Sequence, residues 1–343
     1  MARVSALLRQ GILALAATLA LAAPAIADEA EFFKGKTVRL VVGFAPGGGY
    51  DLYARMLAPY LSKQMGATFV VENQPGAGGI TALNRIYAAT PDGLTWMAVN
   101  GTGAAFGQLA EQSGIRFDIA KMGHLGTMNL DPWVWIVATA SPIKTARDAF
   151  TLGRPVTWGG SGPLDGLSDG ALFTCEAIKL NCKVIMGYKG SRDAAGAVMR
   201  QEMDALYIGE TSAYLYTQGG DTRPIATVAR KRSRFYPDTP TIFEAVDVPK
   251  ENVWLVDFRA TAEDLSRIIL TSPGIAPARL QYMQEQVKAV LTSKEVIDEG
   301  EKTQRYIHFV DAKTTQDAAA RVVSALTPAQ LETVRKIIGT AVK

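Results

Sequence analysis

The feature that most constrains the fold is a valine-rich run, VRLVVGF at residues 38–44, which leads through a proline into three glycines, Gly47 to Gly49. A nearly continuous apolar run of this length is typical of a strand buried on both faces, as in a parallel sheet. Asp51 then begins a helical pattern that ends at Gly66. Glycine costs backbone entropy, so three in succession indicate that something must approach the backbone closely.

The same alternation of short apolar strands and helices continues along the chain, and it predicts an α/β fold. We expect further strands at residues 68–71, 94–99, 156–158, 184–186, 205–208 and 225–228. We expect helices at residues 80–89, 167–180, 192–200, 277–291, 294–302 and 328–342. The chain therefore reads as two α/β units followed by a helical tail that must pack on one of them.

The first 27 residues have the composition of an export signal. Arg3 and Arg9 precede the apolar stretch from Gly11 to Ala23, and Ala25-Ile26-Ala27 has the small-x-small pattern of a cleavage site. A membrane-spanning helix is the alternative, but the uncharged stretch is slightly short for one and no stop-transfer charges follow it. We therefore predict secretion with cleavage after Ala27.

The charge balance excludes a nucleic-acid partner. Without Arg3 and Arg9, the chain keeps 34 of its 36 basic residues against 33 acidic ones, which is too even for a polyanion-binding surface. The 316 or so residues that follow the signal are about enough for two lobes with their own cores.

Cys175 and Cys182 are the only cysteines in the chain. Outside the cytoplasm they can form a disulfide, and two buried thiols are the equal alternative. Their spacing does not suit a metal site, and no histidine lies nearby.

Three segments repeat one layout, in which a strand runs through a glycine-rich turn into a helix: residues 43–51, 156–167 and 184–193. In open parallel sheets, ligands bind beyond the carboxyl ends of the strands, where helix N-termini direct free N–H groups and the positive end of the dipole. The alternative is that these are tight turns with no ligand. Three such turns in a two-lobe protein favour a small anion gripped between the lobes.

Several motifs carry a family resemblance that covers nearly the whole chain after the signal. The segment KTVRLVVGFAPGGGYDLYAR (36–55) resembles the N-terminal signature of the solute-binding proteins of tripartite tricarboxylate transporters, also called the Bug family. Further matches are VVENQPGAGGI (70–80), PDGLT (91–95), YKGS (188–191), DALY (204–207) and RSRFYPDTPTIFEA (232–245).

The resemblance implies two α/β lobes that close on a ligand like a flytrap, with C-terminal helices that return to the first lobe. On this basis we expect residues 28–140 and 251–343 to form the first lobe, and residues 141–250 to form the second. It also implies capture in the periplasm of a small carboxylate, such as a di-, tri- or aromatic carboxylate, for membrane transporter subunits. We expect the receptor to be a monomer without a cofactor.

The resemblance places the glycine turn of the first lobe at the ligand, namely Gly47, Gly48, Gly49, Tyr50 and Asp51. Asp51 can cap the helix, hold a bridging water, or do both. Further donors are expected at the strand end Asn100, Gly101 and Thr102 and, in the second lobe, at Ser161, Gly162, Gly190, Ser191, Thr211 and Ser212.

Two further groups of residues leave alternatives open. Arg192 can pair with a second ligand carboxylate, or be an exposed arginine in the first turn of a helix. Trp158, Tyr188 and Tyr207, together with Tyr50, can wall a pocket for a ring or hydrocarbon chain, or belong to the core.

An enzyme is the main rival hypothesis. A hydrolase needs a nucleophile, a histidine and an orienting acid, but Pro163 disrupts the G-x-S-x-G pattern around Ser161, and the chain has only two histidines. We therefore predict a binding protein, with a ligand-presenting subunit of a periplasmic sensor as the alternative role.

Overall fold

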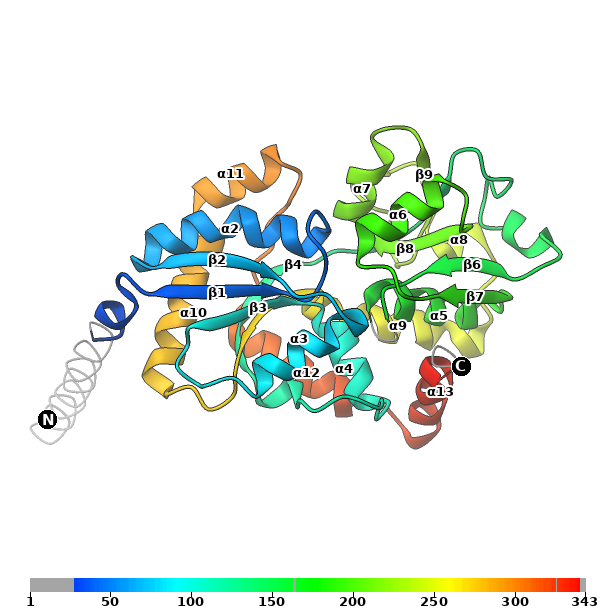
Figure 1. The fold of residues 1–343 in the computed structure, drawn as a ribbon. Coiled ribbons are helices and arrows are strands. Elements are labelled where there is room, and N and C mark those ends of the chain that lie inside the picture. The colour runs from blue at the N-terminus through cyan, green and yellow to red at the C-terminus, as the bar shows by residue number, and fades with distance from the viewer. Residues whose placement is uncertain (1–27, 163–164, 325, 340–343) are drawn as a thin grey trace, which may run out of the picture.

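The computed structural model describes residues 28–162, 165–324 and 326–339. The expected signal and its cleavage after Ala27 lie outside these residues. Figure 1 shows two lobes side by side, each built on one sheet, with the chain passing between them at the centre. None of the helices in the described ranges is long and apolar enough to cross a membrane.

The first sheet has the strand order β2-β1-β3-β10-β4. Its strands are β1 (Thr37–Val42), β2 (Thr68–Asn73), β3 (Thr95–Val99), β4 (Gly123–Asn129) and β10 (Arg267–Thr271). β1 is parallel to β2 and β3, while β10 is antiparallel to β3 and β4. Val38 and Leu40 of β1 enter one core and Val41 enters the other, so the valine-rich run is buried on both faces as its composition predicts.

The second sheet has the strand order β7-β6-β8-β5-β9. Its strands are β5 (Trp133–Ala138), β6 (Val156–Gly159), β7 (Cys182–Ile185), β8 (Ala205–Gly209) and β9 (Thr222–Thr227). β6 is parallel to β7 and β8, and β5 runs antiparallel between β8 and β9. All six residues of β5 are buried.

The position of β5 corrects the expected lobe boundary at residue 140. The chain leaves the first sheet after Asn129 and enters the second at Trp133, because the apolar run 133–138 fits between two strands of the second sheet. We call residues 130–132 the first crossing segment. Residues 262–266, which lead back into β10, are the second crossing segment.

Helices cover both faces of each sheet. Those between the strands are α2 (Gly49–Met65), α3 (Ile80–Tyr87), α4 (Gly101–Leu109), α5 (Gly166–Ile178), α6 (Ser191–Met199), α7 (Glu210–Thr217), α8 (Ile242–Ala245) and α9 (Val253–Thr261). The C-terminal helices are α10 (Pro277–Leu291), α11 (Lys294–Lys302), α12 (Ala312–Ser324) and α13 (Pro328–Gly339). The helices expected near residues 80–89, 167–180, 192–200 and 277–302 are therefore confirmed to within a few residues.

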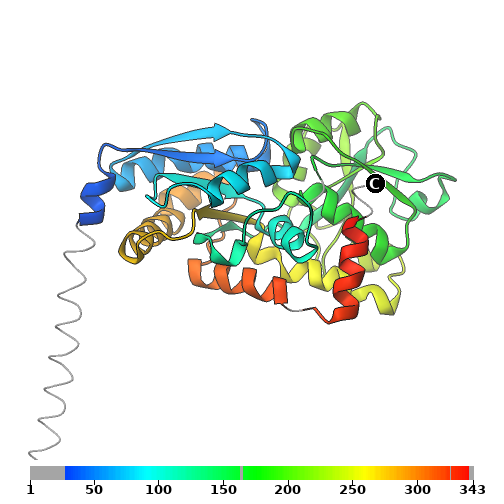
Figure 2. The ribbon, with the colours of Figure 1, turned by 60° about the horizontal axis from the view of Figure 1, so that its bottom comes forward.

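The helical tail divides between the lobes. α10 packs on α2 and β4, and α12 packs on β4 and α4, as expected for a return to the first lobe. α13, however, packs against α5 of the second lobe as well as α4, and α9 also packs on α5. Figure 1 shows α13 below the second lobe, and in Figure 2, where the bottom is turned forward, this red helix lies in front of that lobe. The expectation that residues 251–343 all belong to the first lobe is wrong for these two helices, whose apolar faces complete the core around α5.

Cys175 and Cys182 form a disulfide that joins the end of α5 to the start of β7. This result settles the choice between a disulfide and two thiols. The bond closes a loop with a sequence separation of 7, so its effect on the unfolded chain is modest.

Replacing both cysteines with alanine should lower the free energy of unfolding by about 2–3 kcal/mol, because the unfolded chain then regains the entropy that the short loop removes. Urea denaturation of the oxidised protein and of the double variant measures the difference. A reducing agent should destabilise the unaltered protein and leave the variant unchanged. Equal sensitivity of both proteins to the reductant would contradict the prediction.

Candidate functional site

A cleft lies between the two lobes where several helix N-termini meet. The cleft, together with its open mouth, has an empty volume of about 520 Å³. The lining residues at the helix starts are Gly48 and Gly49 of α2, Gly166 and Leu167 of α5, Ser191 of α6 and Ser212 of α7. The first N–H groups of a helix have no partner within it, and the dipole makes that end attractive to anions. The cleft is therefore suited to a small anion.

The glycine turn of the first lobe is held by Asp51. Gly47 has a φ of +83°, which favours glycine, and its N–H donates to Asp51 Oδ2 at 2.8 Å. Arg55 and Asn73 also donate to the Asp51 carboxylate, at 3.0 and 2.9 Å. Burial alone would raise the pKa of Asp51, but these hydrogen bonds outweigh it and hold the pKa below its usual value.

The other two glycine-rich turns use the same device. Ser161 N–H donates to Asp165 at 2.6 Å, and Lys189 N–H donates to Asp193 at 3.1 Å. In each turn the aspartate stands four residues after the donor, as Asp51 does after Gly47. An acidic side chain thus fixes each turn from beside the helix start. This role accounts for aspartates beside an anion site.

Asp165 is the most buried of these carboxylates. It accepts hydrogen bonds from the Ser161 hydroxyl and from Ser168 N–H, the latter at 2.6 Å. Burial nevertheless raises the pKa of Asp165 above its usual value. The carboxylate lines the cleft, but its oxygens are already engaged with the chain.

The lobes touch each other around the cleft. Ala45 N–H of the first lobe donates to Lys189 O of the second at 2.9 Å. A Cβ added at Gly162 would lie 2.4 Å from Gly78 N, so these two loops meet backbone to backbone. The structure therefore shows the lobes closed on one another.

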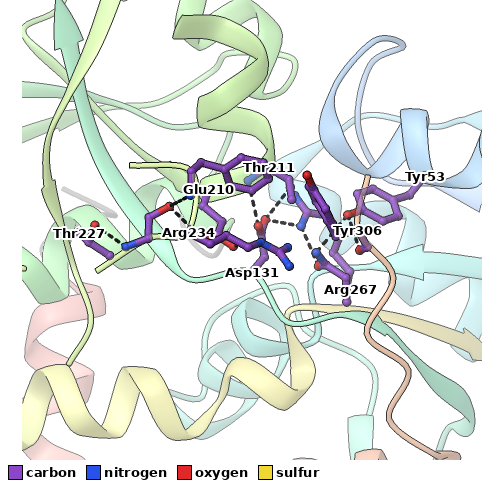
Figure 3. Close-up of polar contacts among 11 residues, drawn as sticks. Tyr53, Asp131, Glu210, Thr211, Thr227, Arg234, Arg267 and Tyr306 are labelled. Carbon is purple, nitrogen blue, oxygen red and sulfur yellow. Dashed lines mark hydrogen bonds and ion pairs between the residues drawn. The ribbon is translucent and has the colours of Figure 1, made fainter. Parts of the chain in front are cut away.

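Arg267 carries the positive charge of the cleft. It is 5 % exposed, forms an ion pair with Asp131, and donates to Asn129 Oδ1 at 3.0 Å. Thr211 N–H donates to Asp131 at 3.0 Å. Figure 3 shows Asp131 lying between Thr211 and Arg267. Burial alone would lower the pKa of Arg267, but Asp131 raises it, so the guanidinium stays charged.

The rest of the cleft wall is largely apolar. The lining side chains of this kind are Phe44, Tyr50, Trp133, Leu167 and Ile208. Tyr50 stacks on Phe44 with ring centroids 5.2 Å apart, and its hydroxyl donates to Ser266 O at 2.7 Å. The ring of Tyr50 therefore faces the cleft while its hydroxyl is engaged by the second crossing segment.

The structure brings together part of the predicted site. Gly48, Gly49, Tyr50, Ser191 and Ser212 line the cleft. Three neighbouring residues do not line the cleft. Gly47 and Asp51 hold the glycine turn, and Thr211 donates to Asp131. Gly190 is buried against Phe44 and Ala45 of the first lobe.

The remaining predicted residues lie away from the cleft lining. Thr102 donates to Ala262 O, Gly101 packs on Ile268, and Asn100 lies behind Gly166. Ser161 and Gly162 support the α5 turn. Trp158 and Tyr207 are fully buried: Tyr207 stacks on Trp133, and Trp158 packs at a tilted angle against Trp135. Tyr188 packs against the same core.

Arg192 is exposed on the outer side of the glycine turn. Its Nη1 would lie 2.6 Å from a Cβ added at Gly47, and it lines a separate surface depression with Lys189 and Arg200. In this closed arrangement it covers the turn from outside.

Sequence reasoning missed the residues of the crossing segments. Asp131 and Arg267 line the cleft, as do Ser266 and Trp133, but none of them lies in a glycine-rich turn. The available signal is the single charge at the start of an otherwise apolar strand, RIILT at 267–271. Trp133 lies both in a strand and in the cleft wall.

The comparisons with known proteins address the family directly. The model of the family described as "Tripartite tricarboxylate transporter family receptor" matches residues 53–269. A Cupriavidus necator protein named "UPF0065 protein in gbd 5'region" is 30% identical over 245 residues, which are 69% of this chain and 72% of that protein. The chain belongs to the tripartite tricarboxylate transporter receptor family. The resemblance drawn from its motifs is thereby confirmed.

Other proteins resemble the chain more distantly. "Protein BugT" of Bordetella pertussis is 25% identical over 66% of this chain and 70% of that protein. The periplasmic binding protein BugD has a TM-score of 0.72 at 19% identity, over 88% of this chain and 97% of that one. The R. palustris protein Rpa4515, solved with adipate, has a TM-score of 0.73 at 20% identity, over 89% and 97%. These structures confirm the two-lobe fold of the family.

Replacing Asp51 with asparagine should lower the free energy of unfolding at pH 7 by about 1–3 kcal/mol, because a buried carboxylate that holds the turn is lost. The folded pKa is lowered, so this stabilisation is present above about pH 4 and is lost as the pH falls through the folded pKa. Urea denaturation should therefore show a smaller difference in the free energy of unfolding between the unaltered protein and the variant at pH 3.5 than at pH 7. Asp317→Asn, at an exposed helix pair, is the control and should change stability by less than about 0.5 kcal/mol.

Proposed function

We propose that this chain is an extracytoplasmic receptor that captures a small organic carboxylate between its lobes and delivers it to transporter subunits in the membrane. It acts as a monomer, exported with removal of residues 1–27, and it binds its ligand without catalysing a reaction. The observation that carries the proposal is the convergence of four helix N-termini and one buried arginine on a single cleft between lobes.

Helix N-termini suit a carboxylate because their N–H groups donate to both oxygens and their dipoles favour negative charge. The N-termini come from both lobes, α2 from the first and α5, α6 and α7 from the second. A ligand held by both sets stabilises the closed arrangement over the open one. A transporter can then distinguish loaded from empty receptor by shape.

Two relatives of similar fold support the carboxylate class. MatC of Rhodopseudomonas palustris, solved with bound malate, has a TM-score of 0.69 at 19% identity, over 88% of this chain and 99% of that one. The Rpa4515 structure contains adipate. Both compounds are small carboxylates, which is the class that we propose for this chain.

The arrangement around Ser161 supports binding without catalysis. The Ser161 hydroxyl donates to Asp165 and supports a helix cap instead of meeting a histidine. His124 is buried in the first lobe, where Nε2 contacts Ile119 O at 2.8 Å. In the described ranges, no group of three histidine, cysteine, aspartate or glutamate residues could hold a metal ion.

Replacing Gly49 with valine should weaken carboxylate binding by about 10- to 100-fold, which corresponds to an overpacking cost of about 1–3 kcal/mol. A Cβ at this position would lie 2.5 Å from Ser212 Oγ and 3.0 Å from Arg267 Nη2, so it would hold the lobes apart. The measurement is calorimetry of refolded protein against a carboxylate panel that includes malate, citrate, adipate, hexanoate and benzoate, after a thermal-shift screen.

Gly219→Val is the matched control, because the nearest atom to a Cβ there is Asp221 Oδ2 at 3.5 Å, in a loop outside the cleft. It should bind as tightly as the unaltered protein. If no carboxylate of the panel shifts the melting temperature or releases heat, the proposed function is wrong. Full affinity in the Gly49 variant would place the ligand elsewhere on the molecule.

A further inference from the structure

We infer that Arg267 selects the ligand, holding its carboxylate on one edge of the guanidinium while the apolar walls of the cleft enclose a hydrocarbon body. The ligand class is then a carboxylate with an alkyl or aryl body, in preference to a hydroxylated acid. This inference rests on the proposed function and names the substrate class of the same cleft.

One edge of the Arg267 guanidinium is available. Nη1 carries the ion pair with Asp131 and the bond to Asn129. Nε is buried and has no hydrogen-bond partner among the described residues, and Nη2 reaches only Ser212 Oγ, at 3.3 Å. The Nε–Nη2 edge is therefore still able to take both oxygens of a carboxylate.

Other arginines of this chain use that same edge for carboxylates. Arg39 binds Glu72 with Nε and Nη2 at 2.9 and 3.0 Å. Arg230 binds Asp257 in the same way, at 2.8 and 2.7 Å. These pairs lie at the surface, whereas Arg267 lines a buried cleft in which a charge-assisted bond is stronger.

The neighbouring backbone can complete the carboxylate site. A Cβ added at Gly49 would lie 3.0 Å from Arg267 Nη2, so the arginine and the start of α2 are adjacent. A carboxylate at this point meets the guanidinium edge and the first N–H groups of a 17-residue helix together.

The remaining walls favour an apolar body. Phe44, Leu167 and Ile208 offer no hydrogen-bonding side-chain group to the cleft, and Trp133 offers only Nε1, which is buried and has no hydrogen-bond partner among the described residues. A ligand hydroxyl that loses water without gaining a partner is penalised, while a hydrocarbon body gains from burial.

Most polar groups of the cleft are already engaged. Asp131 accepts from Thr211 and Arg267, and Asp165 accepts from Ser161 and Ser168. The hydroxyl of Tyr50 donates to Ser266 O, and that of Ser191 is bonded to Tyr216. Apart from the edge of Arg267, the lining side-chain groups without a hydrogen-bond partner among the described residues are Ser266 Oγ and Trp133 Nε1. A ligand that carries several hydroxyl groups therefore finds few partners.

The experiment is calorimetry of the refolded protein with compounds that share six carbons: hexanoate, adipate, hexanamide and citrate, with benzoate and malate added. We expect hexanoate, adipate or benzoate to bind at least about 10-fold more tightly than malate and citrate. Hexanamide should not bind, because it lacks the charge. This comparison uses the unaltered protein and does not depend on the folding of a variant.

Arg267→Lys tests the arginine itself. Lysine keeps the charge beside Asp131 but lacks the two-pronged edge, so affinity for the best carboxylate should fall by about 30-fold or more. Arg259→Lys is the matched control. Arg259 is also a buried arginine paired with an aspartate, Asp169, at 3.3 Å, and it is not among the described residues that line the cleft. The affinity of the Arg259→Lys variant for the same carboxylate should stay within about 3-fold of that of the unaltered protein.

The outcomes separate the two proposals. Tight binding of malate or citrate without binding of hexanoate, adipate or benzoate overturns the inference and leaves the proposed function standing. The inference is also overturned if the Arg267→Lys and Arg259→Lys variants bind the best carboxylate with equal affinity. If none of the carboxylates binds, the proposed function itself falls, and the inference falls with it.

Discussion

The ion pair between Asp131 and Arg267 is the interaction on which the arrangement of the two lobes depends. Asp131 lies in the first crossing segment, and Arg267 begins β10 directly after the second. Asn129, which pairs with Arg267 in the sheet, donates to the Tyr53 hydroxyl at 3.0 Å, and Thr211 ties Asp131 to α7. Figure 3 shows this network running from Tyr53 through Arg267 to Glu210. Because each charge is buried, removing one partner alone would leave the other uncompensated, at a cost of about 3–5 kcal/mol.

A second constraint is shared by the three glycine-rich turns. In each, an aspartate accepts the N–H four residues before it and so fixes the turn, and Asp165 also accepts Ser168 N–H at the start of the helix that follows. The carboxylates of Asp51 and Asp165 are buried, and their surroundings move their pKa values in opposite directions. Asp51 has Arg55 beside it, whereas hydrogen bonds alone do not overcome the burial of Asp165. The two lobes therefore use one local geometry in two different electrostatic settings.

The sequence predicts the elements that arise from local patterns, and it fails where the decisive contacts are distant in the chain. The run at 38–44 predicts a strand buried on both faces because its composition alone requires two apolar neighbours. Two of the strand–turn–helix repeats locate Gly48, Gly49 and Ser191 at the cleft. The membership of β5 depends on pairing with β8 and β9, some 70 residues or more away, which periodicity cannot indicate. Asp131 and Arg267 are separated by |i−j|=136. Neither residue has a local reason to be charged, so only the fold reveals that they meet.

The charges in the cleft wall also explain how a nearly neutral chain can hold an anion. Asp131 offsets the charge of Arg267, and Asp165 adds a further carboxylate to the lining of the cleft. Side-chain charge alone therefore does not make the cleft positive. The attraction must come from the backbone, through the N-termini of α2, α5, α6 and α7, together with the one guanidinium edge that remains available. Backbone donors are fixed in position by the folds of both lobes, so they act together only when the lobes are closed. A site of this kind couples ligand binding to closure more directly than a cluster of flexible basic side chains on one lobe would.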